Sequence, residues 1–178
     1  NSLLDINLIN KKYCGNLRDS YLEVEKKLKI NVKKFNVIIT AGGASVGEED
    51  HLIKVINKIG KILFWKAAIK PGRPIALGKV GNCYIICLPG NPVSVQLLYA
   101  LLVKPFILYL AGASFLLPIN EKVKVNFNMR KKTRRMEWLR VIKKEKNHEF
   151  IAKKFPKQGS GMISSMAYSD GIIEIPEK

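Results

Sequence analysis

The feature that most constrains the fold is a buried strand, a glycine loop and a helix in direct succession. Residues 37–40 form a short run of mostly β-branched side chains that ends at Ala41-Gly42-Gly43. Between Glu49 and Gly60, aliphatic side chains recur at helical spacing, and residues 62–66 read as the next strand. Strands that alternate with helices predict a parallel α/β sheet, in which ligands bind at the carboxyl ends of the strands.

Further elements extend this pattern on both sides. Residues 18–34 alternate apolar and charged side chains with the period of an amphipathic helix. Residues 75–77 and 83–88 read as strands around a Gly81-Asn82 hairpin signal, and residues 93–110 read as a helix. We therefore predict a three-layer α/β/α sandwich with a mostly parallel sheet over residues 1–112, incomplete at its N-terminal end.

The pattern changes after Gly112. Apolar and polar residues alternate at 122–128, 138–142 and 172–175, and no helical stripe of comparable length lies between them. This alternation predicts a small β-rich, barrel-like module over residues 113–178, which we expect to be incomplete at its end.

The chain is strongly basic, with 31 Lys and Arg against 14 Asp and Glu, a net charge of +17. A surface for nucleic acid or membrane headgroups would produce such an excess, and so would compositional drift. Aromatic residues do not interleave with the basic runs and no nucleic-acid motif is present. We therefore expect no nucleic-acid partner. A nucleic-acid-binding protein is the third and least favoured interpretation of the sequence, because it rests on charge alone.

Cysteine content and hydropathy bear on location. Cys14, Cys83 and Cys87 show no metal-ligand spacing, which favours a reducing, cytoplasmic compartment. The most apolar segment, residues 97–118, contains Lys104 and Pro105, so we expect no membrane span there.

The first candidate site is the loop from Thr40 to Asp50. Its glycines let backbone N–H groups approach an anion, and Ser45 adds a hydroxyl. The acidic run Glu48-Glu49-Asp50 has two interpretations that the sequence leaves open. The carboxylates stabilise the start of the next helix, or they hold Mg²⁺ against a phosphate.

The second candidate is the turn from Phe64 to Pro74. Its three basic residues are Lys66, Lys70 and Arg73, around a turn that proline stiffens. Lysine and arginine at this density suit phosphate or another tetrahedral oxyanion, and a solvated surface cluster is the alternative. We expect Trp65, in the same segment, to lie in the core.

The third candidate is the loop Leu88-Pro89-Gly90-Asn91-Pro92. Its two prolines fix φ on either side of Gly-Asn, so the loop loses little entropy on binding a ligand. A rigid connection between a strand and a helix is the alternative.

The three segments together, GGxSVGxxD, FWKxxxKPGxP and LPGNPVS in this order, resemble the pterin-binding domain of MoeA-type molybdopterin molybdotransferases, a domain that gephyrin shares. Trp138-Leu139-Arg140 and residues 158–165 resemble the family's final β-module. The resemblance covers nearly everything from about Arg18 onward.

The resemblance implies a specific reaction. The family takes adenylylated molybdopterin, hydrolyses its phosphoanhydride, exchanges the dithiolene-bound metal for molybdenum from molybdate, and releases AMP. By matching position, Asp50 would handle metal and phosphate, with Mg²⁺ as cofactor, and Lys66 and Lys70 would act in catalysis on phosphate or molybdate. Arg140 and Ser160 would complete an oxyanion pocket from the β-module. The substrate-binding residues implied in this way are Gly42, Gly43, Ser45, Arg73, Pro89, Gly90, Asn91, Pro92, Arg140 and Ser160.

The family has further N-terminal domains that contribute acidic residues to the site. We therefore expect this chain to be the C-terminal part of a homodimeric protein, with the molybdopterin adenylyltransferase as a further partner. A non-catalytic pterin-binding or scaffold module of the same fold is the second reading of the sequence, from a different functional class.

Overall fold

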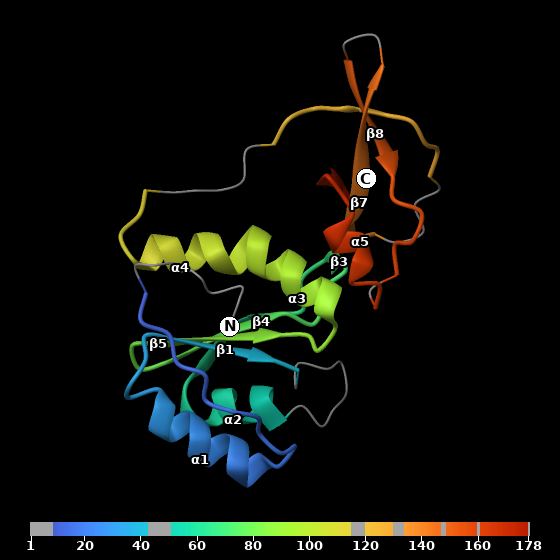
Figure 1. Ribbon diagram of the computed structural model, residues 1–178. Coiled ribbons are helices and arrows are strands. Elements are labelled where there is room, and N and C mark those ends of the chain that lie inside the picture. The colour runs from blue at the N-terminus through green and yellow to red at the C-terminus, as the bar shows by residue number, and fades with distance from the viewer. Residues whose placement is uncertain are drawn as a thin grey trace.

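The computed structural model describes residues 9–42, 51–114, 120–129, 134–146, 149–159 and 161–177. An α/β unit is followed along the chain by a β-rich unit, as Figure 1 shows in colours that run from blue to red. The predicted α/β domain with a β-rich module after it is thus confirmed.

The first sheet has the strand order β1-β5-β4-β2. Its members are β1 (Val37–Ala41), β2 (Lys61–Trp65), β4 (Ala76–Val80) and β5 (Cys83–Leu88). Among these described strands β1 and β5 are parallel, whereas β4 is antiparallel to both β5 and β2, so this part of the sheet is mixed rather than mostly parallel. The cause is the Gly81-Asn82 hairpin, where Gly81 adopts a φ of 56° and the chain reverses between adjacent strands.

Helices cover both faces of this sheet, which makes the three predicted layers. On one face, α1 (Tyr21–Asn31) and α2 (His51–Ile59) pack around Ile85 and Cys87 of β5. On the other face, the helix that begins at Pro92 packs around Ile86 and Leu88. Adjacent residues of β5 thus face different helix layers, as the two-residue repeat of a strand requires.

The helix that follows β5 runs without interruption from Pro92 to Leu110. It consists of α3 (Pro92–Leu98), a π-helical segment η2 (Tyr99–Val103) and α4 (Lys104–Leu110). The helix continues through Lys104 and Pro105, because the π-helical turn comes where Pro105 has no N–H for an α-helical bond. By length and composition it is the one helix among the described residues that could cross a membrane. Here its inner side, with Leu97 and Leu98, forms part of the core.

The second sheet belongs to the β-rich unit. Its strands are β3 (Ile69–Lys70), β6 (Lys124–Val125), β7 (Met136–Lys146), β8 (Glu149–Lys154) and β9 (Gly171–Ile175), with the short helix α5 (Ser164–Ala167) beside them. The order is β3-β7-β8-β6, and β9 also pairs with β7. Although β3 precedes β4 in the chain, it pairs with β7, and this pairing joins the two units.

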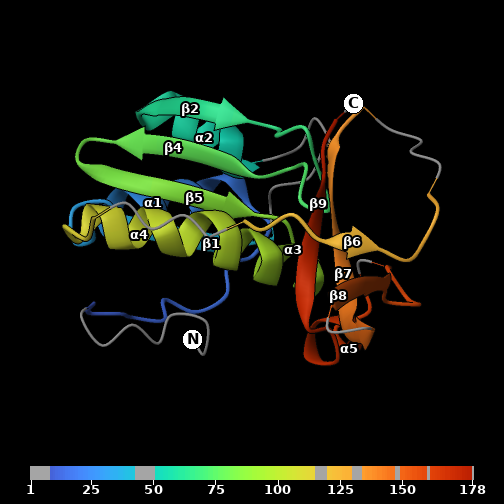
Figure 2. The ribbon, with the colours of Figure 1, turned by 90° about the horizontal axis from the view of Figure 1, so that it is seen from above.

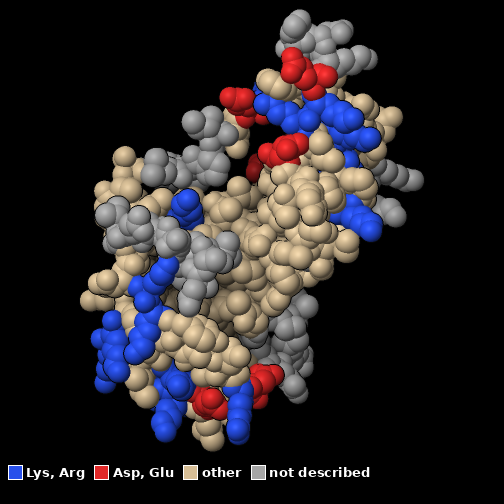
Figure 3. Space-filling model, in the orientation of Figure 1, with Lys and Arg blue, Asp and Glu red and all other residues tan. Residues whose placement is uncertain are grey.

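Positive charge is unevenly distributed over the surface. On the face shown in Figure 3, Lys and Arg side chains gather over the β7–β8 hairpin and around α1. Between these regions, the surface over the long helix is mostly uncharged.

Candidate functional site at the junction of the two sheets

Three strands of the first sheet end at the same edge. In the register of the sheet, Ala41 lies opposite Leu88 at the ends of β1 and β5. Ala76 lies opposite both Cys87 of β5 and Trp65, the last residue of β2. The described parts of the three motif loops therefore lie at one edge of the first sheet, and Figure 2 shows the second sheet at this end of the first. Gly43, Ser45 and Asp50 lie outside the described residues, and so does Ser160 of the β-module.

The described part of the first motif loop touches the third. The Gly42 N–H donates to the Leu88 carbonyl oxygen at 3.1 Å, and Gly42 has a φ of 89°. A Cβ atom at Gly90 would lie 3.6 Å from the Gly42 Cα. The two backbones therefore approach each other closely at the carboxyl ends of β1 and β5. A ligand at this point would contact main-chain atoms rather than side chains.

The Pro89–Pro92 loop also begins the long helix. The Asn91 side-chain oxygen accepts a hydrogen bond from the Ser94 N–H at 3.3 Å, and Pro92 occupies the first helical turn. Pro89 is buried, while Gly90 and Pro92 are exposed. The capping role explains Asn91 structurally, and it leaves the exposed Gly90 backbone available to a ligand.

Two buried polar atoms on either side of residues 43–50 were not singled out by sequence reasoning. Thr40 Oγ1, near the end of β1, and His51 Nδ1, at the start of α2, have no hydrogen-bond partner among the residues that the structure describes. A buried polar atom without a hydrogen-bond partner lowers the free energy of unfolding by about 1–3 kcal/mol. The sequence signal was only that each residue borders the glycine loop.

The second motif is a closed turn between β2 and β4. The Lys66 N–H donates to the Ile75 carbonyl oxygen and the Ala67 N–H to the Arg73 carbonyl oxygen, each at 3.0 Å. Arg73 and Lys66 are both exposed, and Lys66 has a φ of 68°. The turn thus presents two basic side chains at the edge where the strands end.

Trp65 lies outside the core, contrary to our expectation. It is 37% exposed, because β2 is the edge strand of the sheet and no described strand pairs with its outer side. The Lys66 ammonium lies over its ring, with Nζ 4.1 Å from the ring centroid. The indole therefore supports a lysine of the candidate site through a cation–π contact.

Lys70 is placed by the second sheet. Its strand β3 pairs in parallel with β7, with Lys70 opposite Glu137. The Lys70 Nζ lies 3.2 Å from Glu137 Oε2; the carboxylate side chain is 7% exposed and the lysine side chain 51%. Sequence reasoning missed Glu137, for which the available signal was an acidic residue between the apolar Met136 and Trp138 near the start of a strand.

Arg140 is almost completely buried, at 1% exposure, on β7. Its Nε–H donates to Ser165 Oγ at 3.1 Å, and Nη2 donates to the Gly159 carbonyl oxygen at 3.2 Å. Burial lowers the pKa of the Arg140 guanidinium. Both acceptors are neutral, and no carboxylate in the described part of the chain pairs with this cation. Within the described residues, two of the five N–H donors of this arginine have an acceptor, and three have none.

Lys70 and Arg140 do not contact each other within the described residues. Arg140 lies three positions beyond Glu137 on β7, and the pairing of β7 with β9 is regular through this stretch. An odd number of positions along a regular strand changes the face of the sheet. The prediction that Lys70, Arg140 and Ser160 jointly hold one oxyanion stays a prediction.

The described residues contain no group of three or more His, Cys, Asp or Glu that could hold a metal ion. Asp50, the expected Mg²⁺ ligand, lies outside them. Among the described residues, the groups that could bind an anion are the cationic side chains and the backbone N–H groups.

Two family models match the chain. Residues 3–109 match the probable molybdopterin binding domain, and residues 122–178 match the MoeA C-terminal region, domain IV. A molybdopterin molybdenumtransferase of Haemophilus influenzae is 34% identical over 180 aligned residues, covering 96% of this chain and 44% of that protein. A putative molybdopterin biosynthesis protein of Methanocaldococcus jannaschii is 26% identical, covering 94% of this chain and 39% of that protein.

The fold matches a solved structure over nearly its whole length. A molybdopterin biosynthesis MoeA protein from Pyrococcus horikoshii superposes with a TM-score of 0.67 at 28% identity, covering 93% of this chain and 38% of that one. The chain thus spans about two fifths of the length of these relatives. With one family model over more than half of its residues and a second over its β-module, the chain belongs to the MoeA-type family of molybdenum cofactor biosynthesis proteins.

Proposed function

We propose that this chain is the pterin- and molybdate-handling part of a molybdopterin molybdotransferase. In the proposed reaction, water cleaves the phosphoanhydride of adenylylated molybdopterin and AMP leaves. Molybdenum from molybdate then replaces the metal bound to the dithiolene, and that metal is released. The observation that carries the proposal is the buried Arg140 guanidinium, which keeps three N–H donors and has only neutral partners among the described residues.

A buried cation of this kind suits a small dianion. Taking a guanidinium out of water is costly unless a charge or a set of hydrogen bonds compensates it. Molybdate is a compact tetrahedral dianion with four oxygen acceptors, and each charge-assisted contact to such an ion contributes about 1.5–3 kcal/mol. Bound molybdate would supply the missing counter-charge of Arg140.

The edge of the first sheet suits the pterin nucleotide. Exposed backbone at Gly90, the close approach to Gly42 and the basic side chains of Lys66 and Arg73 lie where three strands end. Main-chain N–H groups bind phosphate and ring heteroatoms, and the lysine and arginine neutralise the phosphates. Thr40 and His51 each have a buried polar atom that a ligand or water at this edge would satisfy.

The remaining parts of the proposal concern the whole protein. We propose a cytoplasmic homodimer in which another domain or subunit completes the site, Asp50 holds Mg²⁺, and a molybdopterin adenylyltransferase supplies the substrate. The chain spans only part of the length of its relatives, which supports a contribution of another domain to the site. Cys14, Cys83 and Cys87 form no disulfide in the described part of the chain, which is compatible with a reducing compartment.

The test is cofactor formation from adenylylated molybdopterin at increasing molybdate, with AMP release and bound molybdenum measured separately. We expect the 178-residue chain to bind both ligands and to insert molybdenum more slowly than a full-length relative. Insertion at the full rate would contradict the need for another domain. Pterin binding without AMP release, even when the missing domains are supplied, would identify a scaffold instead.

A further inference from the structure

We propose that Ser165 and Gln158 are positioning residues that hold Arg140 ready for its oxyanion. Ser165 sets the direction of the guanidinium and Gln158 sets the position of the Arg140 backbone. The inference rests on the proposed function for the identity of the ligand. The geometry of the arginine can be tested without any ligand.

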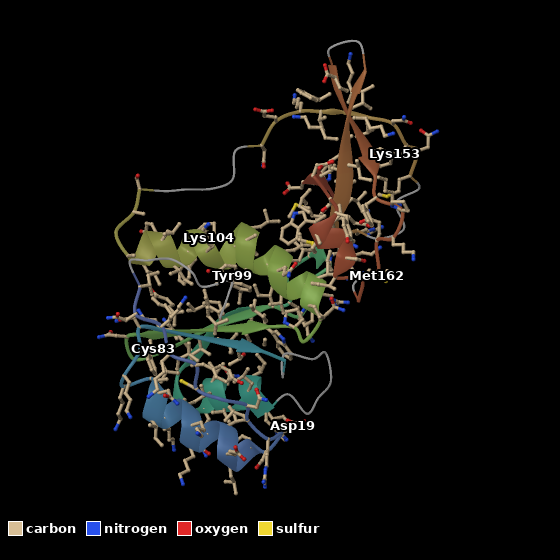
Figure 4. All side chains as sticks on the ribbon, in the orientation of Figure 1. Asp19, Cys83, Tyr99, Lys104, Lys153 and Met162 are labelled. Carbon is tan, nitrogen blue, oxygen red and sulfur yellow. The ribbon has the colours of Figure 1, made fainter. Side chains whose placement is uncertain are left out.

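Ser165 is fully buried in α5, 25 residues away from Arg140 in the chain. Its hydroxyl lies 2.6 Å from the Met162 carbonyl oxygen and 3.1 Å from Arg140 Nε. A carbonyl oxygen can only accept, so the single hydroxyl proton goes to Met162 and a lone pair of Oγ faces the arginine. Figure 4 shows Met162 close to α5. The orientation of this acceptor is thus determined before any ligand binds.

Gln158 acts on the main chain of Arg140. Its Oε1 accepts from the Arg140 N–H at 3.1 Å, and its Nε2 donates to the Arg140 carbonyl oxygen at 2.7 Å and to the Phe155 carbonyl oxygen at 2.9 Å. The strand β8 pairs with β7 only from Val141 onward. At Arg140 the Phe155 N–H also donates to the Arg140 carbonyl oxygen, at 2.9 Å, and the Gln158 side chain adds the acceptor for the Arg140 N–H. Main chain and side-chain amide together therefore continue the ladder by one residue.

The two contacts join Arg140 and the segment after Phe155 into one unit. Gly159, next to Gln158, accepts the Nη2 hydrogen bond, so the segment holds the arginine at its backbone and at its guanidinium. Arginine loses considerable rotamer freedom when it is ordered, and a group ordered in advance binds its ligand more tightly. Ser165 and Gln158 supply this order from outside the contact with the ligand.

The decisive variant is Ser165→Ala, and Ser164→Ala is its matched control. Ser164 is the preceding residue of α5 and is half-buried. Its carbonyl oxygen accepts a hydrogen bond from the Tyr168 N–H, and its hydroxyl forms no hydrogen bond with the described residues. Molybdate binding to the 178-residue chain is measured by calorimetry. We expect Ser165→Ala to raise the molybdate Kd about tenfold and Ser164→Ala to leave it unchanged. Equal Kd values for Ser165→Ala and the unmodified chain would overturn the proposal.

A second measurement reports on the arginine in the absence of ligand. The Arg140 Nε–H should give a protected ¹⁵N–¹H signal in the unmodified chain, and Ser165→Ala should lose this protection. Gln158→Ala should broaden or shift the signal through the backbone. If Ser165→Ala does not fold, Ser165→Cys keeps a weaker acceptor of similar shape and should give an intermediate Kd and intermediate protection.

The two measurements separate this proposal from the proposed function. A protected Nε–H that depends on Ser165, together with no binding of molybdate, would refute the oxyanion and keep the positioning. An Nε–H that exchanges freely in the unmodified chain would refute the positioning, whatever the chain binds.

Discussion

The Lys70 ammonium lies 3.2 Å from the Glu137 carboxylate, and this ion pair within the second sheet holds the segment between β2 and β4 to the β-module. Lys70 follows the α/β strand β2 in the chain, while Glu137 begins the long strand of the β-module. The backbones pair at the same position, with Lys70 opposite Glu137. The turn that carries the basic residues of the site is thus held to the β-module by main chain and side chain together.

This ion pair predicts an asymmetry in stability. Lys70→Ala leaves a buried carboxylate without its ammonium, whereas Glu137→Gln removes the charge and keeps an acceptor for a half-exposed lysine. We expect Lys70→Ala to cost about 1–2 kcal/mol and Glu137→Gln less than about 1 kcal/mol of the free energy of unfolding. Urea unfolding of both variants measures the difference. A larger loss in Glu137→Gln would show that Glu137 stabilises the fold mainly through other contacts.

Arg140→Ala should impair the use of molybdate and spare the pterin. Removing one charge-assisted contact, worth about 1.5–3 kcal/mol, weakens molybdate dependence by about 10- to 150-fold. Molybdate titrations of cofactor formation measure the first effect, and calorimetry of pterin binding measures the second. Unchanged molybdate dependence in Arg140→Ala would remove the β-module from the site.

Gly72→Ala should destabilise the basic turn more than Gly81→Ala destabilises the hairpin. Both glycines have positive φ, 110° and 56°, but a Cβ at Gly72 would come within 3.0 Å of Leu98 while a Cβ at Gly81 meets nothing within 4 Å. Overpacking of this kind adds about 1–3 kcal/mol. Thermal unfolding gives the comparison, and equal losses would mean that backbone strain alone matters at Gly72.

The helices α1 and α2 are joined by Glu25, which predicts a pH dependence. Hydrogen bonds from Lys29 and Lys58, at 2.7 and 3.0 Å, lower the pKa of the Glu25 carboxyl. A carboxyl with a lowered pKa in the folded state stabilises the protein above its unfolded pKa, near 4.5. This stabilisation disappears as the pH falls through the folded pKa.

The measurement is the urea midpoint of Glu25→Gln against the unmodified chain at descending pH. We expect the difference to be full at neutral pH and to vanish in acid. Glu23→Gln removes the same charge from the same helix and serves as the control, since Glu23 forms no ion pair in the described part of the chain. A difference that persists at the lowest pH would exclude the ion pair as its cause.

Local patterns were sufficient for most of the elements, though not for β3 and β8, and for the edge at which the site lies. The helices at α1 and α2, the long helix after Pro92 and the strands β7 and β9 appear where periodicity placed them. Periodicity works here because each element buries one face, so the spacing of apolar residues records its geometry. The edge followed as well, because every strand that precedes a motif loop ends there.

Such local patterns do not predict contacts between distant parts of the chain. The exposure of Trp65 depends on β2 being the last strand of its sheet, which no residue near Trp65 specifies. The hairpin signal already implied that β4 and β5 are antiparallel, whereas the antiparallel pairing of β2 with β4 had no signal in the sequence.

The sequence by itself thus determined the layered α/β fold, the β-rich module and the residue types of an anion site. Only the tertiary structure decided that Lys70 meets Glu137, 67 positions away, and that Arg140 is held by Gln158 and Ser165, 18 and 25 positions away. The physical reason is the range of the forces. Propensity and amphipathic spacing act between residues a few positions apart, whereas ion pairs, ladder hydrogen bonds and burial form between whatever surfaces the packed sheets bring together.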